Sequence, residues 1–331
     1  MRKKWIRGGI FLCLVLLLLS NLNRILCVKS PHGVDQTRYL YVQPKNKIDV
    51  LFLGSSHVHC NVNTQLLWDE YGMAAYLMTG AEQPLWNSYY NLKEALKNQK
   101  PKLVVLDMFC PSRFYDDFQP GWADENLDGM RISLNKLEAV YTSVQEEQSH
   151  FFLGFTEYHS RYDQLTTEDF QNFVWNRKTQ ERWKGYTPLK RHAELTEPDM
   201  SHVTTSQEMT EKSKEYFEKI VELTKKEGIT LALISGPYLL EERDQEVYNS
   251  IGQLAEKDGL LFWNTNTPAH YREMGLDFST DYADHAHLNK AGGAKYTAYL
   301  GKWLSQNYSF PDRRGQKGYE SWENQLMKSG E

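Results

Sequence analysis

The amino-acid sequence predicts a three-layer α/β/α sandwich built on a mainly parallel sheet. Short apolar runs of four to six residues recur along the chain and end in turn residues such as Gly54, which is typical of buried strands. Between these runs lie longer segments with helical periodicity, and strands that alternate with helices of this length form parallel sheets covered on both faces. A chain of 331 residues is long enough for one large domain with an insertion.

The elements follow one another from residue 48 onward. The mainly aliphatic run 48–53 predicts the first strand, and the turn residues Gly54-Ser55-Ser56 end it. Pro84 predicts a helix start, because a first-turn residue needs no amide hydrogen. The expected strands are 48–53, 74–78, 102–107, 230–235 and 260–263, and the expected helices are 64–71, 84–98, 206–227, 241–258 and 290–305.

The alternation of strands and helices is interrupted after the third strand. Residues at about 111–205 lack it, so we expect a mixed, aromatic-rich insertion there. Segment 111–190 has 15 aromatic residues among its 80. Such side chains stack on sugar rings or fill a small core, and the core interpretation is favoured.

The net charge of −5 is unevenly distributed. Residues 1–28 contain five basic residues and no acidic ones, whereas residues 29–331 contain 33 basic and 43 acidic residues, a net charge of −10. Binding of nucleic acid or anionic lipid needs clustered cations, so this acidity argues against nucleic acid as a partner. It also favours a neutral or weakly charged glycan over a strongly anionic polymer.

The N-terminal segment is typical of an export signal. Four basic residues precede an uncharged apolar run at 8–23. The run is short enough for a cleaved signal peptide, but no small-x-small cleavage site follows it, which favours an uncleaved anchor over 1–28. Because the cations precede the span, the rest of the chain is expected outside the cytoplasm, on a single-pass anchor in the cell membrane. Residues 29–46 are expected to form a stalk.

Two of the four cysteines, Cys60 and Cys110, fall in the exported body. They form one disulfide or remain two buried thiols, and the sequence leaves both alternatives open. No Cys/His group has the spacing of a zinc site, so the sequence predicts neither a metal nor another cofactor.

Two polar motifs suggest nucleophilic catalysis. Ser56 follows the first predicted strand, at the sheet edge where open α/β folds bind their ligands. Asp284 precedes His287 by three residues, just before the last predicted helix. A serine needs a base to remove its proton, and a histidine base needs a carboxylate to orient it. Taken singly, each motif is better explained as an ordinary turn or a solvated loop with a helix cap.

Together, and in this order, the motifs resemble those of the SGNH (GDSL-like) hydrolase superfamily. Gly54-Ser55-Ser56 matches its Gly-Asp-Ser block, with Ser55 in place of Asp, and Asp284-His285-Ala286-His287 matches its Asp-x-x-His block. The resemblance implies that Ser56 is the nucleophile, His287 the base and Asp284 the orienting acid. The Gly-Ser-Ser-His form looks most like the branch of the alginate acetyltransferases and the D-alanine transfer protein of lipoteichoic acid synthesis. The resemblance to the superfamily also implies an SGNH-like catalytic domain over 47–331.

The sequence departs from the family where hydrolases place a Gly and an Asn for the oxyanion. No Gly-x-Asn-Asp follows the third strand, so Gly80 is expected to serve as the glycine and Gln83 to replace the Asn. In the insertion, His159 and Arg161 are candidates for contact with the donor or acceptor. The spacing of His57 and His59, two residues apart without a third ligand, disfavours a metal pair, and the Asp-x-x-His spacing favours His287 over His285, which would use Asp281.

The resulting hypothesis is a membrane-anchored, extracytoplasmic serine O-acyltransferase that transfers an acyl group, expected to be acetyl, to a cell-envelope or secreted polysaccharide. Its implied partners are the polysaccharide acceptor and an acyl donor, supplied by a membrane-bound O-acyltransferase as in the related branch. A carbohydrate acetylesterase with the same triad is the first alternative. A silent scaffold that binds polysaccharide or an acyltransferase is the second.

Overall fold

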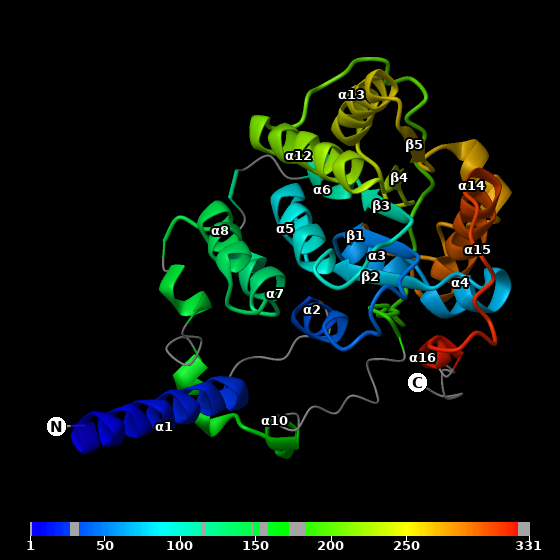
Figure 1. The fold of residues 1–331 in the computed structure, drawn as a ribbon. Helices are drawn as coiled ribbons and strands as arrows, with labels where there is room; N and C mark the ends of the chain where they lie inside the picture. Colours follow the sequence, from blue (N-terminus) through cyan, green and yellow to red (C-terminus); the bar gives the residue numbers. More distant parts are fainter. Residues whose placement is uncertain are drawn as a thin grey trace.

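Five parallel strands form one sheet in the order β2-β1-β3-β4-β5 (Figure 1). The computed structural model describes residues 2–26, 33–113, 117–118, 120–146, 148–152, 158–171 and 183–323. The strands are β1 (Val50–Gly54), β2 (Ala75–Thr79), β3 (Leu103–Asp107), β4 (Thr230–Ser235) and β5 (Leu261–Asn264). The strand order reverses beside β1, so the carboxyl end of β1 lies at the position where such sheets bind ligands.

Helices cover both faces of the sheet, which confirms the predicted three-layer α/β/α architecture. In β1, Leu51 and Leu53 belong to one apolar core, and Val50 and Phe52 belong to the other, as the alternation of side chains along a strand requires. The first core is closed by α5 (Leu85–Ala95), α12 (Glu211–Glu227) and α13 (Glu242–Asp258). The second is closed by α3 (Ser56–Asn61), α4 (Thr64–Tyr71), α14 (Pro268–Met274) and α15 (Lys290–Asn307).

Each strand lies within two residues of its predicted position. The largest difference among the helices is at the start of α12, which was expected from residue 206 and begins at Glu211. Thr210 explains the later start, because its hydroxyl accepts a hydrogen bond from the Ser213 amide at 3.2 Å and caps the helix.

Residues 33–46 correct the expectation of a stalk. They contain α2 (Val34–Leu40), which packs against β2 and against α7 (Ala123–Leu127). Val34 and Leu40 are buried, and Gln36 donates to the Gly185 carbonyl at 2.7 Å. The polar composition of this segment predicts an exposed linker. Instead, the apolar side chains on one side of α2 pack against the folded body, and the amide of Gln36 is hydrogen-bonded to it. Residues 29–32 lie outside the described residues.

The described part of the insertion up to residue 171 is built of short helices, whereas residues 183–205 form an extended segment without a helix. The helical elements are α6 (Phe109–Arg113), η1 (Pro120–Trp122), α7, α8 (Leu134–Ser143), η2 (Gln148–Phe151), η3 (His159–Asp163) and α10 (Thr167–Gln171). Ala139 and Val140 of α8 join the core beside α5, and Phe151 is buried there. Tyr141 and Tyr162 are exposed, so the aromatic residues divide between core and surface.

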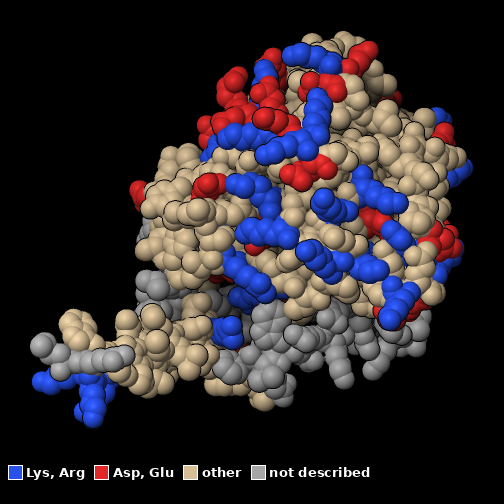
Figure 2. Space-filling model, viewed as in Figure 1, with Lys and Arg blue, Asp and Glu red and all other residues tan. Residues whose placement is uncertain are grey.

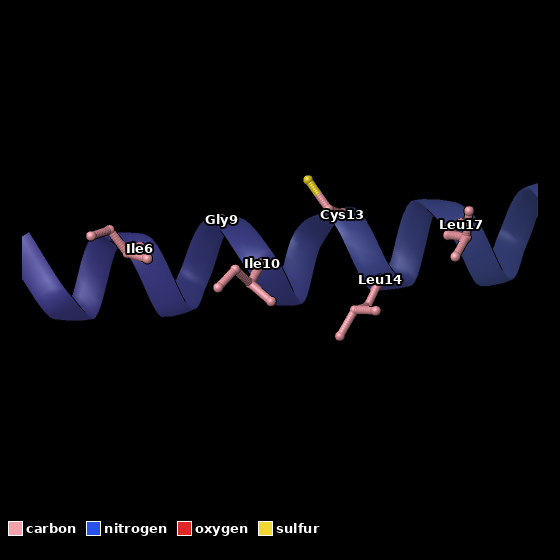
Figure 3. Close-up of a pocket in the computed structure, with 6 residues that line it drawn as sticks. All are labelled: Ile6, Gly9, Ile10, Cys13, Leu14 and Leu17. Atoms are coloured by element: carbon pink, nitrogen blue, oxygen red, sulfur yellow. The ribbon is translucent and has the colours of Figure 1, made fainter.

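The N-terminal helix α1 (Arg2–Leu26) extends away from the body (Figure 1). At about 1.5 Å per residue it is about 37 Å long, which exceeds the roughly 30 Å of a bilayer's hydrocarbon layer. Within the described part of the chain, its residues Lys3–Leu26 are long and apolar enough to cross a membrane. Figure 3 shows a shallow, wholly apolar groove along one side of it, lined by Ile6, Gly9, Ile10, Cys13, Leu14 and Leu17.

The last described segment returns to the sheet. The short helix α16 (Glu320–Glu323) contacts α4, and its Trp322 is fully buried. The Trp322 indole donates to the Ala75 carbonyl at 3.1 Å, at the start of the edge strand β2. This contact covers part of the sheet edge at β2.

Candidate active site

Ser56 is the first residue of α3, immediately after β1. The turn requires Gly54, whose φ of 152° suits glycine and whose added Cβ would lie 2.6 Å from the Cβ of Asp107. Ser55 caps the helix by accepting from the His57 amide at 3.2 Å. These local features fix the backbone that carries Ser56 at the carboxyl edge of the sheet.

The structure brings Ser56, His287 and Asp284 together in one chain of hydrogen bonds. The Ser56 Oγ lies 2.8 Å from Nε2 of His287. The other ring nitrogen, Nδ1, lies 2.7 Å from Oδ1 of Asp284. These are the contacts that general-base activation of a serine requires.

The charge state of Asp284 assigns the direction of these bonds. Burial alone would raise the pKa of its carboxyl, but the His287 ring, a backbone amide and the Arg191 guanidinium lower that pKa to about 2. Asp284 is therefore ionised at neutral pH and accepts from Nδ1–H of His287. In the tautomer that donates from Nδ1, Nε2 has a lone pair that can accept the Ser56 hydroxyl proton.

Further contacts hold the loop that carries the acid and the histidine. Asn61, a fully buried residue of α3, accepts from the Leu288 amide at 2.9 Å. Asn289 caps α15 by accepting from two of its amides, and its own amide donates to the Thr280 carbonyl at 2.7 Å. Asn61 therefore ties the serine-bearing helix directly to the residue after His287. Sequence reasoning missed Asn61, since a lone buried Asn has no pattern that marks it.

The candidate oxyanion residues lie after β2. Gly80 is covered by the insertion, because a Cβ there would lie 2.3 Å from Oδ1 of Asn126 on α7. Gln83 is buried, donates to Ser88 Oγ at 3.0 Å and accepts from the Asn91 amide at 2.8 Å. Here the structure differs from the expectation, because the Gln83 side chain is engaged with α5 rather than directed at Ser56.

The two histidines beside Ser56 are both buried and have separate partners. His57 lies 3.4 Å from Oδ1 of Asp107 and stacks on Phe109. His59 lies 3.1 Å from the Thr79 hydroxyl on β2. Among the described residues, no group of three or more His, Cys, Asp or Glu side chains is arranged to hold a metal.

His285 and the two cysteines complete the surroundings. The Asp281 carboxylate, considered as the partner of His285, instead accepts from Lys295 at 2.7 Å. Cys60 and Cys110 are both free thiols and buried, which resolves the alternatives left open by the sequence. Burial raises the pKa of Cys60 to about 12 and that of Cys110 well above its ordinary value, so neither is a thiolate nucleophile at neutral pH.

The structure places His159 and Arg161 elsewhere. Both belong to η3, which contacts α1. Arg161 donates to the Leu26 carbonyl at the end of α1 and lies 3.4 Å from Asp169. The described contacts of Arg161 therefore connect the insertion to the N-terminal helix and do not include the three residues around Ser56.

Comparison with known proteins gives structural neighbours only. No family model matches the chain, and no curated protein matches its sequence. A candidate acylhydrolase from Bacteroides fragilis NCTC 9343 is similar over 82% of this chain and 97% of its own, with 13% identity and a TM-score of 0.41. An acetyl xylan esterase from the rumen bacterium Butyrivibrio proteoclasticus is similar over 80% of this chain and 65% of its own, with 11% identity and a TM-score of 0.32.

At these identities and TM-scores, neither likeness carries an argument about the activity of this chain. The match spans about two thirds of the length of the xylan esterase.

Proposed function

We propose that this protein is a serine-dependent acyl-ester enzyme that works as an O-acyltransferase on a polysaccharide. The observation that carries the proposal is the hydrogen-bonded chain Ser56–His287–Asp284, with separations of 2.8 and 2.7 Å. An ionised carboxylate, a singly protonated imidazole and a hydroxyl in this order form the arrangement that activates serine for acyl transfer.

The reaction has two steps. His287 Nε2 takes the Ser56 proton while Oγ attacks the acyl carbon of the donor ester, and the imidazolium then gives that proton to the departing alcohol. The product of this step is an acyl-enzyme on Ser56. In the second step His287 takes a proton from a sugar hydroxyl, whose oxygen attacks the acyl carbon. The bond from that carbon to Ser56 Oγ breaks, and the imidazolium returns the proton to Oγ, which regenerates Ser56 and releases the acylated sugar.

The developing oxyanion needs donors at a fixed position in each step. The backbone amides of Ser56 and Gly80 are the proposed donors. The Gln83 side chain is left out of this proposal because its amide is bonded within the fold. A site with few donors suits slow transfer better than fast hydrolysis, since losing one donor typically costs about 100-fold in rate.

Two features support transfer to a polymer at a membrane. The His287 and Asp284 side chains are 20% and 31% exposed, so the triad lies near the surface, where a large acceptor can approach it. The apolar helix α1 suits attachment to a membrane, with the body outside the cytoplasm and a membrane-bound O-acyltransferase as the source of acyl groups. Water can approach the same serine, which keeps the acetylesterase as the alternative.

The acceptor's charge is a separate question. The body's net charge argued for a neutral glycan, but Figure 2 shows Lys and Arg side chains gathered in a band across one face of the molecule. The net charge of the body therefore does not describe each of its faces, so both a neutral and an anionic acceptor are included in the test.

The test follows p-nitrophenyl acetate consumption by the wild type, Ser56→Ala and His287→Ala, with and without xylo-oligosaccharide or oligogalacturonate. Transfer predicts faster consumption with acceptor and an acetylated sugar detected by mass spectrometry. Consumption that yields only acetate selects the esterase. If both variants consume the ester as fast as wild type, the triad assignment is wrong and the scaffold is favoured.

Membrane attachment is tested separately. Removing residues 1–26 is expected to move the protein from the membrane fraction to the soluble fraction, while turnover of p-nitrophenyl acetate changes less than about twofold, because α1 contributes no group to the triad. A truncated protein that stays with the membrane would contradict the role of α1.

A further inference from the structure

Residues 183–195 of the insertion form a strap that crosses the elements carrying the triad. At its start, the Lys184 carbonyl accepts from the Leu77 amide of β2 at 2.8 Å. Further along, the Thr187 amide donates to the His59 carbonyl at 2.7 Å. The strap thus pairs first with the edge strand and then with the helix that begins at Ser56.

The same strap then runs beside the loop that carries Asp284 and His287. The Lys290 amide donates to the Leu189 carbonyl at 2.9 Å, and the Ala193 amide donates to the Tyr282 carbonyl at 2.9 Å. These two bonds lie on either side of Arg191 in the strap. These backbone hydrogen bonds alone hold Arg191 next to the loop that carries Asp284 and His287, without any contribution from the Arg191 side chain.

The Arg191 side chain completes the coordination of Asp284. Oδ1 of Asp284 accepts from the His287 ring and from the Ala286 and His287 amides. Oδ2 accepts from a guanidinium nitrogen of Arg191 at 2.8 Å. The terminal torsion of an aspartate is soft, so bonds to both oxygens restrain the carboxylate plane far more than bonds to one.

We propose that Arg191 is a positioning residue of the triad: by holding Oδ2, it keeps Oδ1 of Asp284 in place for His287. This inference rests on the proposed function and assigns part of the site to the insertion. Arg191 touches neither Ser56 nor His287 in the described contacts, so it acts through the carboxylate. Its side chain is 66% exposed, and an exposed ion pair contributes little to folding stability. Replacing Arg191 therefore separates positioning from folding.

The experiment compares Arg191→Gln, Arg191→Lys and Arg191→Ala with Lys190→Gln, which removes a neighbouring exposed cation on the strap. With p-nitrophenyl acetate, Arg191→Gln is expected to lower kcat about tenfold while KM changes less than about twofold. Arg191→Lys should recover part of this loss, because lysine supplies the charge without the planar fork. Lys190→Gln should match wild type, and the melting temperatures of all variants should agree.

Chemical rescue gives a readout that a structural role would not produce. Millimolar guanidinium should raise kcat of Arg191→Ala towards wild type, since the site is open to solvent, and should leave Lys190→Gln unchanged. A kcat for Arg191→Gln equal to that of Lys190→Gln overturns the proposal. So does a loss of kcat that follows a lowered melting temperature and does not respond to guanidinium.

Ser56→Ala, measured in parallel, distinguishes a failure of the positioning role of Arg191 from a failure of the proposed function. Turnover that is lost in Ser56→Ala but unaffected in Arg191→Gln refutes the positioning role alone. Full turnover in Ser56→Ala refutes the proposed function itself and, with it, any role of Arg191 in a triad.

Discussion

The parallel sheet and the insertion after β3 differ in how their residues are fixed. In the sheet, successive strand residues alternate between two apolar cores, so each strand has one possible register. In the insertion, short helices are also held by individual contacts, such as the two hydrogen bonds that the Asn126 amide of α7 donates to the carbonyl of Trp122 in η1 and to that of Ala81 after β2. Ser56 lies at the carboxyl edge of the sheet and Asp284 and His287 lie on the loop before α15, whereas the insertion contributes side chains that cover and brace these groups.

The largest expected effect tests whether the chemistry belongs to the sheet. Ser56→Ala should lower turnover of p-nitrophenyl acetate by about 10³-fold or more, because it removes the nucleophile. The melting temperature should stay within a few degrees, since the Ser56 side chain is only half-buried. Residual activity close to wild type would place the chemistry elsewhere in the molecule.

Asp284→Asn should be nearly as damaging, with a loss of about 10³-fold, because the amide favours the wrong histidine tautomer. The variant also tests the lowered pKa of Asp284, about 2 against an ordinary 3.8. A carboxyl with a depressed pKa contributes stability above its unfolded pKa and loses it as the pH falls through the folded value.

The stability difference between wild type and Asp284→Asn should therefore be constant above about pH 5 and shrink towards about pH 2. Urea unfolding at several pH values measures it. A difference that does not change over this range would show that the carboxylate is not stabilised in the folded state.

Gly54→Ala tests the close approach of β1 to β3. The new methyl group would meet the Asp107 side chain, and we expect a loss of about 2 to 3 kcal/mol in the free energy of unfolding. Gly228→Ala is the matched control, since Gly228 also has a positive φ, 68°, but nothing lies within 4 Å of an added Cβ. Its cost should be about 1 kcal/mol. Equal costs in urea unfolding would mean that backbone conformation alone requires Gly54.

Two buried asparagines, one from each region, allow a direct comparison of how each region affects stability and kcat. Asn61→Ala in α3 and Asn126→Ala in α7 each remove hydrogen bonds, and each should cost about 1 to 3 kcal/mol of stability. Asn61 holds the residue after His287, so its loss should also lower kcat about tenfold. Asn126→Ala should change kcat less than about threefold. The reverse order of the two kcat values would show that the insertion, and not the sheet, sets the geometry.

The sequence predicted the sheet well because hydrophobic runs and turn residues are local signals. The same locality predicted that Ser56 follows β1 and that Asp284 precedes His287 on one loop, and the structure brings these three side chains together. Gln83 was expected at the oxyanion on sequence position alone, and its bonds to Ser88 and Asn91 depend on how α5 packs. Arg191 and Asn61 were missed because their partners are 93 and 227 residues away, and no local pattern marks such contacts.

The central claim is that Ser56 is an activated nucleophile. The most direct test is labelling with a fluorophosphonate probe, followed by peptide mass spectrometry, on wild type, Ser56→Ala and His287→Ala. We expect a covalent adduct on Ser56 in wild type, no adduct at that position in Ser56→Ala, and strongly slowed labelling in His287→Ala. An adduct on a different serine, or labelling of wild type and His287→Ala at equal rates, would contradict the central claim.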